Sequence, residues 1–249
     1  MIADPWFWAL ALVAVALTGI SKGGMGGGAA VATPLMALTI PPAQAAAIML
    51  PVLCVMDIAG VRAYLWRWDT RVVRIIVPAG IVGIAIGGLA IPYMNDDWIR
   101  IMLGVVALGF LFWTLYPRRA LNVGRAPGDA AGWFWGALAG FTSFITHAGS
   151  PPVMVYLLPQ KLDKDAFVAT ALIFFFALNY AKIIPYLWLG LFDAVVLATA
   201  ALLVPVGIAA IYAGQWMQRR IDVAWFYRLI YSLLFLTGTK LLYDGVTGL

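Results

Sequence analysis

The stretch GISKGGMGGGAAVATP, residues Gly19–Pro34, decides how the rest of the chain is interpreted. It places Lys22 and a cluster of glycines between two apolar segments. Glycine is a poor helix residue, and a lysine is costly to bury in an apolar setting. We therefore predict that a helix breaks here and that two short helical segments meet in a turn.

The composition of the whole chain is that of an integral membrane protein. Of its 249 residues, 64% are hydrophobic and 11% are charged, whereas soluble domains contain about 45–50% apolar and about 25% charged residues. Backbone polar groups in lipid must be satisfied internally, which leaves helical bundles or closed barrels. The apolar runs are long and do not alternate, so we predict an all-α polytopic membrane protein.

Charge and scarce residue types exclude several functions. The net charge is +5, but the basic residues gather in short gaps between apolar runs, which follows the positive-inside rule and does not indicate nucleic-acid binding. The single cysteine, Cys54, and the single histidine, His147, argue against a metal cluster. We expect the lipid bilayer as a partner and neither a metal nor another cofactor.

Six apolar runs are long enough, or nearly so, for a bilayer crossing of about 20 residues. Four shorter runs form two pairs, 6–20 with 29–40 and 130–145 with 153–158. The long runs are Ala43–Leu65, Val72–Pro92, Trp98–Tyr116, Phe167–Leu191, Ala194–Met217 and Trp225–Tyr243.

Arginines orient these runs, because cytoplasmic gaps carry an excess of basic residues. The gaps that we expect in the cytoplasm contain Arg62, Arg67, Arg71 and Arg74, then Arg118, Arg119 and Arg125, then Arg219, Arg220 and Arg228. The gaps at 95–97 and 192–193 then face outward, as do both termini. Each short pair consequently starts and ends on one face as a re-entrant hairpin; the alternative is one long, kinked crossing.

The two halves of the chain also match each other in sequence. GISKGGMGGG from Gly19 aligns with GFTSFITHAG from Gly140, DIAGVRAYLW from Asp57 with NYAKIIPYLW from Asn179, and VPAGIVGIAIG (77–87) with VPVGIAAIYAG (204–214). Because the charge bias gives the halves opposite orientations, we predict an inverted-topology repeat, each half a hairpin plus three transmembrane helices. The repeats are residues 1–117 and 130–249, joined by a cytoplasmic linker at 118–129 into a single transporter domain.

Two motifs resemble the TauE/SafE family of sulfite exporters, also called TSUP. They are SKGGMGGGAAVATPL from Ser21 and HAGSPPVMVYLLPQKLDKDAFVATALIFFFALNYAKIIPYLWLGL from His147. The resemblance covers nearly the whole chain, although the second glycine cluster is reduced to HAGSPP. It implies an exporter of sulfite, or of a related small sulfur oxyanion or organosulfonate, in the bacterial inner membrane with both termini periplasmic.

The two hairpin tips are the predicted anion site, near the middle of the bilayer. Glycine lets backbone N–H groups approach a ligand, and the helix after each tip directs its positive dipole end there. Ser150, a favoured N-cap before two prolines, predicts a helix that begins at Pro151. The candidate substrate-binding residues of the tips are Ser21, Lys22, Gly23, Gly24, Gly26, Gly27, Gly28, His147, Gly149 and Ser150.

Polar residues on the long runs extend this candidate site. Asn179, Lys182 and Tyr186 share one helix face, and such stripes face a cavity or the bundle interior. We predict that Asn179 and Lys182 line the pathway; alternatively, Asn179 bonds a neighbouring helix and Lys182 reaches the outer headgroups. Asp57 and His147 are predicted coupling or structural partners. Asp57 could carry a proton or pair with Lys22, which would make that lysine structural. An unperturbed histidine titrates near neutral pH, so a proton-coupled role is also possible for His147.

These features favour a secondary transporter over an enzyme. Two alternatives stay open at this point. One is an anion channel. The other is an intramembrane enzyme that uses Ser143 and His147, which lie four residues apart and could share a helix face.

Overall fold

The structure is a computed structural model that describes residues 2, 4–25, 29–63, 66–115, 127–217, 220 and 223–249. Within these ranges the chain forms ten α-helices and no β-strand. The prediction of an all-α polytopic membrane protein is confirmed. Three of the predicted tip residues, Gly26, Gly27 and Gly28, lie outside the described residues, as does most of the predicted linker.

The helices are α1 (Pro5–Ile20), α2 (Ala29–Met36), α3 (Pro42–Ala63), α4 (Thr70–Ala90), α5 (Asp96–Leu115), α6 (Asp129–Thr146), α7 (Ser150–Leu157), α8 (Lys164–Trp188), α9 (Ala194–Met217) and α10 (Val223–Gly248). A π-helical turn, η1 (Ser21–Met25), continues α1, and short 3₁₀ turns follow α4 (η2, Ile91–Tyr93) and α7 (η4, Leu158–Gln160).

Six helical segments of the described chain are long and apolar enough to cross a membrane. They are Pro5–Gly23, Pro42–Arg62, Thr70–Tyr93, Asp96–Leu115, Lys164–Trp188 and Ala194–Met217. Five of them overlap the predicted long runs. The sixth starts at Pro5, where we expected a short run. Helix α10, which covers the remaining predicted long run, has 26 residues but contains Arg228, Lys240 and Asp244 and is not among the six.

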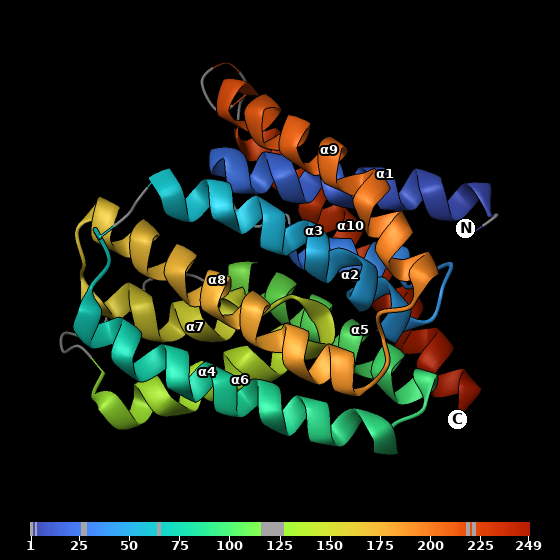
Figure 1. The fold of residues 1–249 in the computed structure, drawn as a ribbon, viewed down its shortest axis with the longest axis horizontal. Coiled ribbons are helices and arrows are strands. Elements are labelled where there is room, and N and C mark those ends of the chain that lie inside the picture. Colours follow the sequence, from blue (N-terminus) through green and yellow to red (C-terminus); the bar gives the residue numbers. More distant parts are fainter. Residues whose placement is uncertain are drawn as a thin grey trace.

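Figure 1 shows where the helices begin and end. Both termini lie at one end of the bundle, where α1 and α3 also begin, whereas α4, α6 and α8 begin at the opposite end. The short helices pack within their pairs, α1 against α2 and α6 against α7. The first pair therefore belongs to the end with the termini, and the second pair belongs to the other end.

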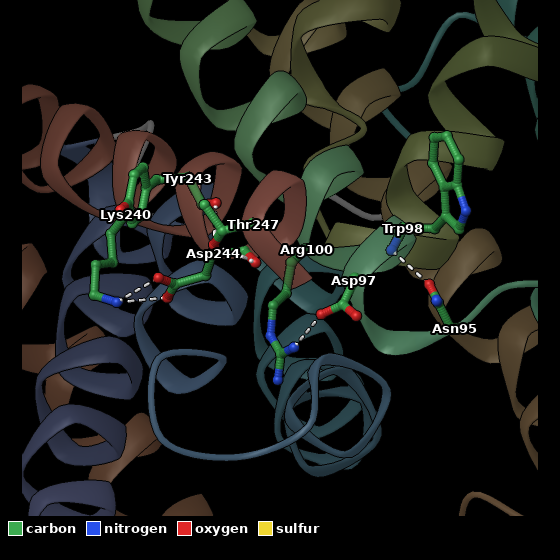
Figure 2. Close-up of polar contacts among 8 residues, drawn as sticks. All are labelled: Asn95, Asp97, Trp98, Arg100, Lys240, Tyr243, Asp244 and Thr247. Carbon is green, nitrogen blue, oxygen red and sulfur yellow. Dashed lines mark hydrogen bonds and ion pairs between the residues drawn. The ribbon is translucent and has the colours of Figure 1, made fainter. Parts of the chain in front are cut away.

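The end opposite the termini carries ion pairs between separate elements. Arg67, after α3, pairs with Asp165 at 2.7 Å, and Arg71 pairs with Asp129 at 3.3 Å. At the end with the termini, Figure 2 shows pairs within single helices: Asp97 with Arg100 in α5, and Lys240 with Asp244 in α10, both at 2.6 Å.

Helices from the two halves of the chain are interleaved. Helix α4 packs against α6, α5 against α10, and α1 against α9. Glycines allow these close approaches: a β-carbon on Gly140 would collide with the carbonyl oxygen of Gly80, and one on Gly19 would meet the carbonyl oxygen of Gly207. Residues 1–115 and 127–249 thus share one core. This arrangement brings the two short pairs together at the centre of the bundle.

Candidate anion-binding site between the hairpins

A cavity of about 160 Å³ lies where the two short pairs meet. We name α1, η1 and α2 hairpin 1, and α6 with α7 hairpin 2. Hairpin 1 lines the cavity with Ser21, Lys22, Ala29 and Ala30, and hairpin 2 with Ser143, His147, Ala148 and Ser150. Helices α3, α5 and α8 complete the wall with Leu53, Asp57, Phe110, Leu172, Phe175 and Asn179.

Ser21 and Lys22 reach the cavity from the π-helical turn η1. The first short run was expected to end at Ile20, but the chain stays helical to Met25. Tertiary packing offsets the poor helix propensity of glycine here: a β-carbon on Gly23 would lie 2.9 Å from the Gln215 nitrogen of α9. A π turn also inserts an extra residue into the helix, which is frequent at functional sites.

Hairpin 2 turns at His147 and Gly149. His147 caps α6 in the left-handed conformation, with φ 56° and ψ 15°. Helix α7 begins at Ser150, one residue before the predicted start, so Ser150 is not its N-cap. The reason is that Pro151 and Pro152 have no N–H, and the next free donor, Val153 N–H, bonds to the Gly149 carbonyl at 3.5 Å instead.

The charged residues of the site form one connected network. The Lys22 ammonium group donates to Oδ1 of Asp57. The side-chain nitrogen of Asn179 donates to the other carboxylate oxygen, Oδ2, at 2.6 Å. Lys182 Nζ in turn donates to Oδ1 of Asn179 at 2.9 Å. Lys22 therefore has the carboxylate partner that we considered as an alternative for it. Asn179 has the alternative considered for it, a bond to a neighbouring helix.

His147 connects this network to hairpin 2. Its Nε2 lies 2.9 Å from the carbonyl oxygen of Ala46, and because a carbonyl can only accept, Nε2 carries the hydrogen. Its Nδ1 lies 3.0 Å from Lys182 Nζ and accepts a hydrogen bond from the ammonium group. These two bonds specify a neutral imidazole.

Burial differs sharply along the network. The Lys22 side chain is 18% exposed, whereas that of Asp57 is 1% exposed. Lys182 is fully buried, so the expectation that it could reach the outer headgroups is wrong. Lys22 is thus the cation of the network that is partly accessible. Its charge acts more strongly in a low-dielectric interior than it would in water.

Two aromatic side chains, which we name the aromatic wall, also line the cavity. Phe110 and Phe175 line the cavity from α5 and α8, and Phe110 stacks on Trp113 with ring centroids 6.4 Å apart. The indole nitrogen of Trp113 is buried and has no hydrogen-bond partner in the described part of the chain. The cavity lining therefore combines charged, hydroxyl-bearing and apolar side chains.

The structure brings most, but not all, of the predicted site residues together. Those that line the cavity are Ser21, Lys22, Asp57, His147, Ser150 and Asn179. Lys182 lies behind Asn179 and His147, and Gly23 packs on α9. Gly149 holds the α6–α7 corner, since a β-carbon there would lie 2.6 Å from the Ala139 carbonyl oxygen. Gly24 is part of η1.

Several lining residues were not among the predicted ligands. Ser143 was considered only as an enzyme nucleophile, yet it lines the cavity beside His147. The internal repeat contained a signal for it, because Ser143 aligns with Lys22. Phe110 and Phe175 gave no comparable signal, since phenylalanines on an apolar helix are ordinary core or lipid-facing residues.

One comparison with known proteins gave a match. A family model described as Sulfite exporter TauE/SafE matches residues 11–241. The match includes hairpin 1 from residue 11 onward, all of hairpin 2 and every described residue that lines the cavity. Searches of curated proteins and of solved structures gave no match.

Proposed function

Because the chain belongs to the sulfite exporter TauE/SafE family, whose members are membrane transporters and not enzymes, we propose that it is a secondary transporter that binds a small sulfur oxyanion or organosulfonate in the cavity between the hairpins. The multi-pass membrane character agrees with the six apolar segments. We place it in a bacterial inner membrane as an exporter, with the Arg67 and Arg71 end in the cytoplasm and both termini in the periplasm.

The observation that carries this proposal is that both hairpins border one cavity with a lysine at its edge. The Lys22 ammonium group supplies a charge, and Ser143 and Ser150 supply hydroxyl groups that can donate to sulfonate oxygens. Helices α2 and α7 begin with Ala29 and Ser150 at this cavity, so their positive dipole ends also lie beside it. The aromatic wall would accommodate the carbon substituent of an organosulfonate.

Three contacts support an inverted repeat as the framework for transport. Asp57 and Asn179, which align in the two halves, meet each other in the structure. Gly19 packs on Gly207, and Gly140 packs on Gly80. The two contacts are equivalent in the repeat, because Gly19 aligns with Gly140 and Gly207 aligns with Gly80. A two-fold relation between the halves would produce these contacts. In such transporters one repeat rocks against the other around a fixed midplane site.

The test is transport by the purified protein in proteoliposomes, with labelled sulfite, thiosulfate, sulfoacetate and taurine. We expect saturable flux of at least one of them. Lys22→Gln should lower kcat/KM by about 100-fold, because a charge-assisted hydrogen bond contributes up to about 3 kcal/mol. The control is Lys240→Gln, which removes an exposed lysine paired with Asp244 at the end with the termini (Figure 2).

Two outcomes would contradict this proposal. Absence of flux for all four anions would remove the substrate class. Unchanged flux in Lys22→Gln would remove the lysine from the binding site. Accumulation of the anion against its gradient would separate a transporter from a passive channel.

A further inference from the structure

Asp57 is an unexpected residue in a site for an anion. It is the only acidic residue among the described residues that line the cavity. It is 1% exposed, and both of its carboxylate oxygens are occupied, one by Lys22 and one by Asn179. A carboxylate at this position repels an incoming anion, so its presence needs a reason.

The two partners of Asp57 differ in how firmly they are held. Asn179 is fixed from behind, because Lys182 donates to its Oδ1 and also to His147. Asp57 and Asn179 therefore form a braced contact between α3 and α8. Lys22 approaches from η1, its side chain is the most exposed of the network's charged residues, and the only partner recorded for its ammonium group in the described chain is Asp57.

An anion in the cavity would compete with Asp57 for this ammonium group. The two negative groups would lie on the same lysine in a largely dehydrated space, where their repulsion is weakly screened. Asp57 would keep its bond from Asn179 when Lys22 leaves, whereas Lys22 would gain the substrate. The contact between η1 and α3 would then open.

We infer that Asp57 is a built-in competitor of the substrate. It holds Lys22 in the unoccupied site and yields it to the anion, so that substrate binding releases hairpin 1 from α3. This inference rests on the proposed function. It gives hairpin 1 two states whose balance depends on the ligand, which is the element that an alternating-access transporter needs. Asp57 acts through Lys22 and is a positioning residue.

Two possible roles of Asp57 predict opposite effects of the Asp57→Asn substitution on anion binding, which makes the inference testable. If Asp57 only positioned Lys22 for the substrate, Asp57→Asn would weaken binding. If Asp57 competes, the variant should bind the anion more tightly, by roughly 5- to 150-fold, the usual range for coupled binding events. The maximal flux of the variant should fall, because the more tightly bound anion is released more slowly. Its KM should also fall.

The experiment measures equilibrium binding of the transported anion to the full-length protein in nanodiscs, and flux in proteoliposomes. Asp97→Asn is the matched control, since Asp97 pairs with Arg100 (Figure 2), does not line the cavity, and undergoes the same charge change. The double variant Lys22→Gln, Asp57→Asn should bind no more tightly than Lys22→Gln alone.

A second measurement needs no variant. Hydrogen–deuterium exchange of Ser21–Met25 in the parent protein should rise when the anion binds, because η1 is released. Slower exchange with the anion, or weaker binding by a folded Asp57→Asn variant, would overturn the inference and leave the proposed function intact. A parent protein that binds none of the four anions would remove both.

Discussion

Hairpins 1 and 2 meet at the same cavity but bring different chemistry to it. Hairpin 1 supplies the charged Lys22 from a π-helical turn, whereas hairpin 2 supplies Ser143, Ser150 and a neutral His147 around a left-handed corner. Their packing is nonetheless similar, because each rests on a long helix of the other half through a glycine. Both hairpins therefore depend on a glycine contact with a facing helix, whereas the lysine of the cavity lining comes from hairpin 1 alone and two of its three serines come from hairpin 2. An anion bound there would have a defined orientation.

The largest effect is expected from substitutions that place a side chain in the two glycine contacts. Gly140→Val and Gly19→Val would each force a side chain onto a backbone carbonyl of the facing helix. Backbone cannot yield as a flexible side chain does, so we expect each variant to lose stability near the upper end of the usual 1–3 kcal/mol for overpacking, about 3 kcal/mol. Thermal unfolding in detergent measures the loss.

Gly109→Val is the matched control for these variants. It makes the same substitution within α5 at a position where a β-carbon would meet nothing within 4 Å. A native unfolding temperature for either Gly140→Val or Gly19→Val would show that the two hairpins are not packed equivalently.

A smaller effect is expected at the corner of hairpin 2. His147→Ala removes the bond to Ala46 and leaves Lys182 without one acceptor, which costs about 1–3 kcal/mol for a buried group. Alanine also tolerates the left-handed backbone poorly, whereas asparagine adopts it readily. We therefore expect His147→Asn to be more stable than His147→Ala in the same unfolding assay.

The left-handed backbone at His147 is a difference between the hairpins, since no described residue of hairpin 1 has a positive φ. Equal unfolding temperatures for His147→Asn and His147→Ala would mean that the left-handed corner does not contribute to the difference between the hairpins.

The smallest expected effect concerns the hydroxyl groups. Ser143→Ala should raise KM for the transported anion by about 2- to 12-fold, the equivalent of one neutral hydrogen bond of about 0.5–1.5 kcal/mol. Flux in proteoliposomes measures it, with the exposed Ser232→Ala on α10 as control. A loss as large as that of Lys22→Gln would contradict the division of roles between the hairpins.

Hydropathy predicted most of the fold because lipid imposes long helices with few alternatives. Helix α3 begins within one residue of the predicted run, and α9 matches it at both ends. The tip of the first hairpin was harder to predict, because glycine propensity describes an isolated helix. The contact of Gly23 with α9 is a tertiary feature that local sequence does not contain.

The candidate site was predictable where a residue is costly in lipid. Lys22, Asp57, Asn179 and Lys182 stood out for that reason, and the structure connects all four. Which of them face the cavity could not be read from the sequence, because it depends on how α3 and α8 rotate against each other. The aromatic wall was unpredictable for the same reason.

The interleaving of the halves has a consequence for synthesis of the chain in the membrane. Helix α4 is separated from its neighbour α6 by α5 alone, but α1 is made long before its neighbour α9, which begins at Ala194. For most of translation the first helix therefore lacks the partner that packs on Gly19 and Gly23. A fragment from a ribosome stalled in the middle of the message would lack α9 and could not form this contact.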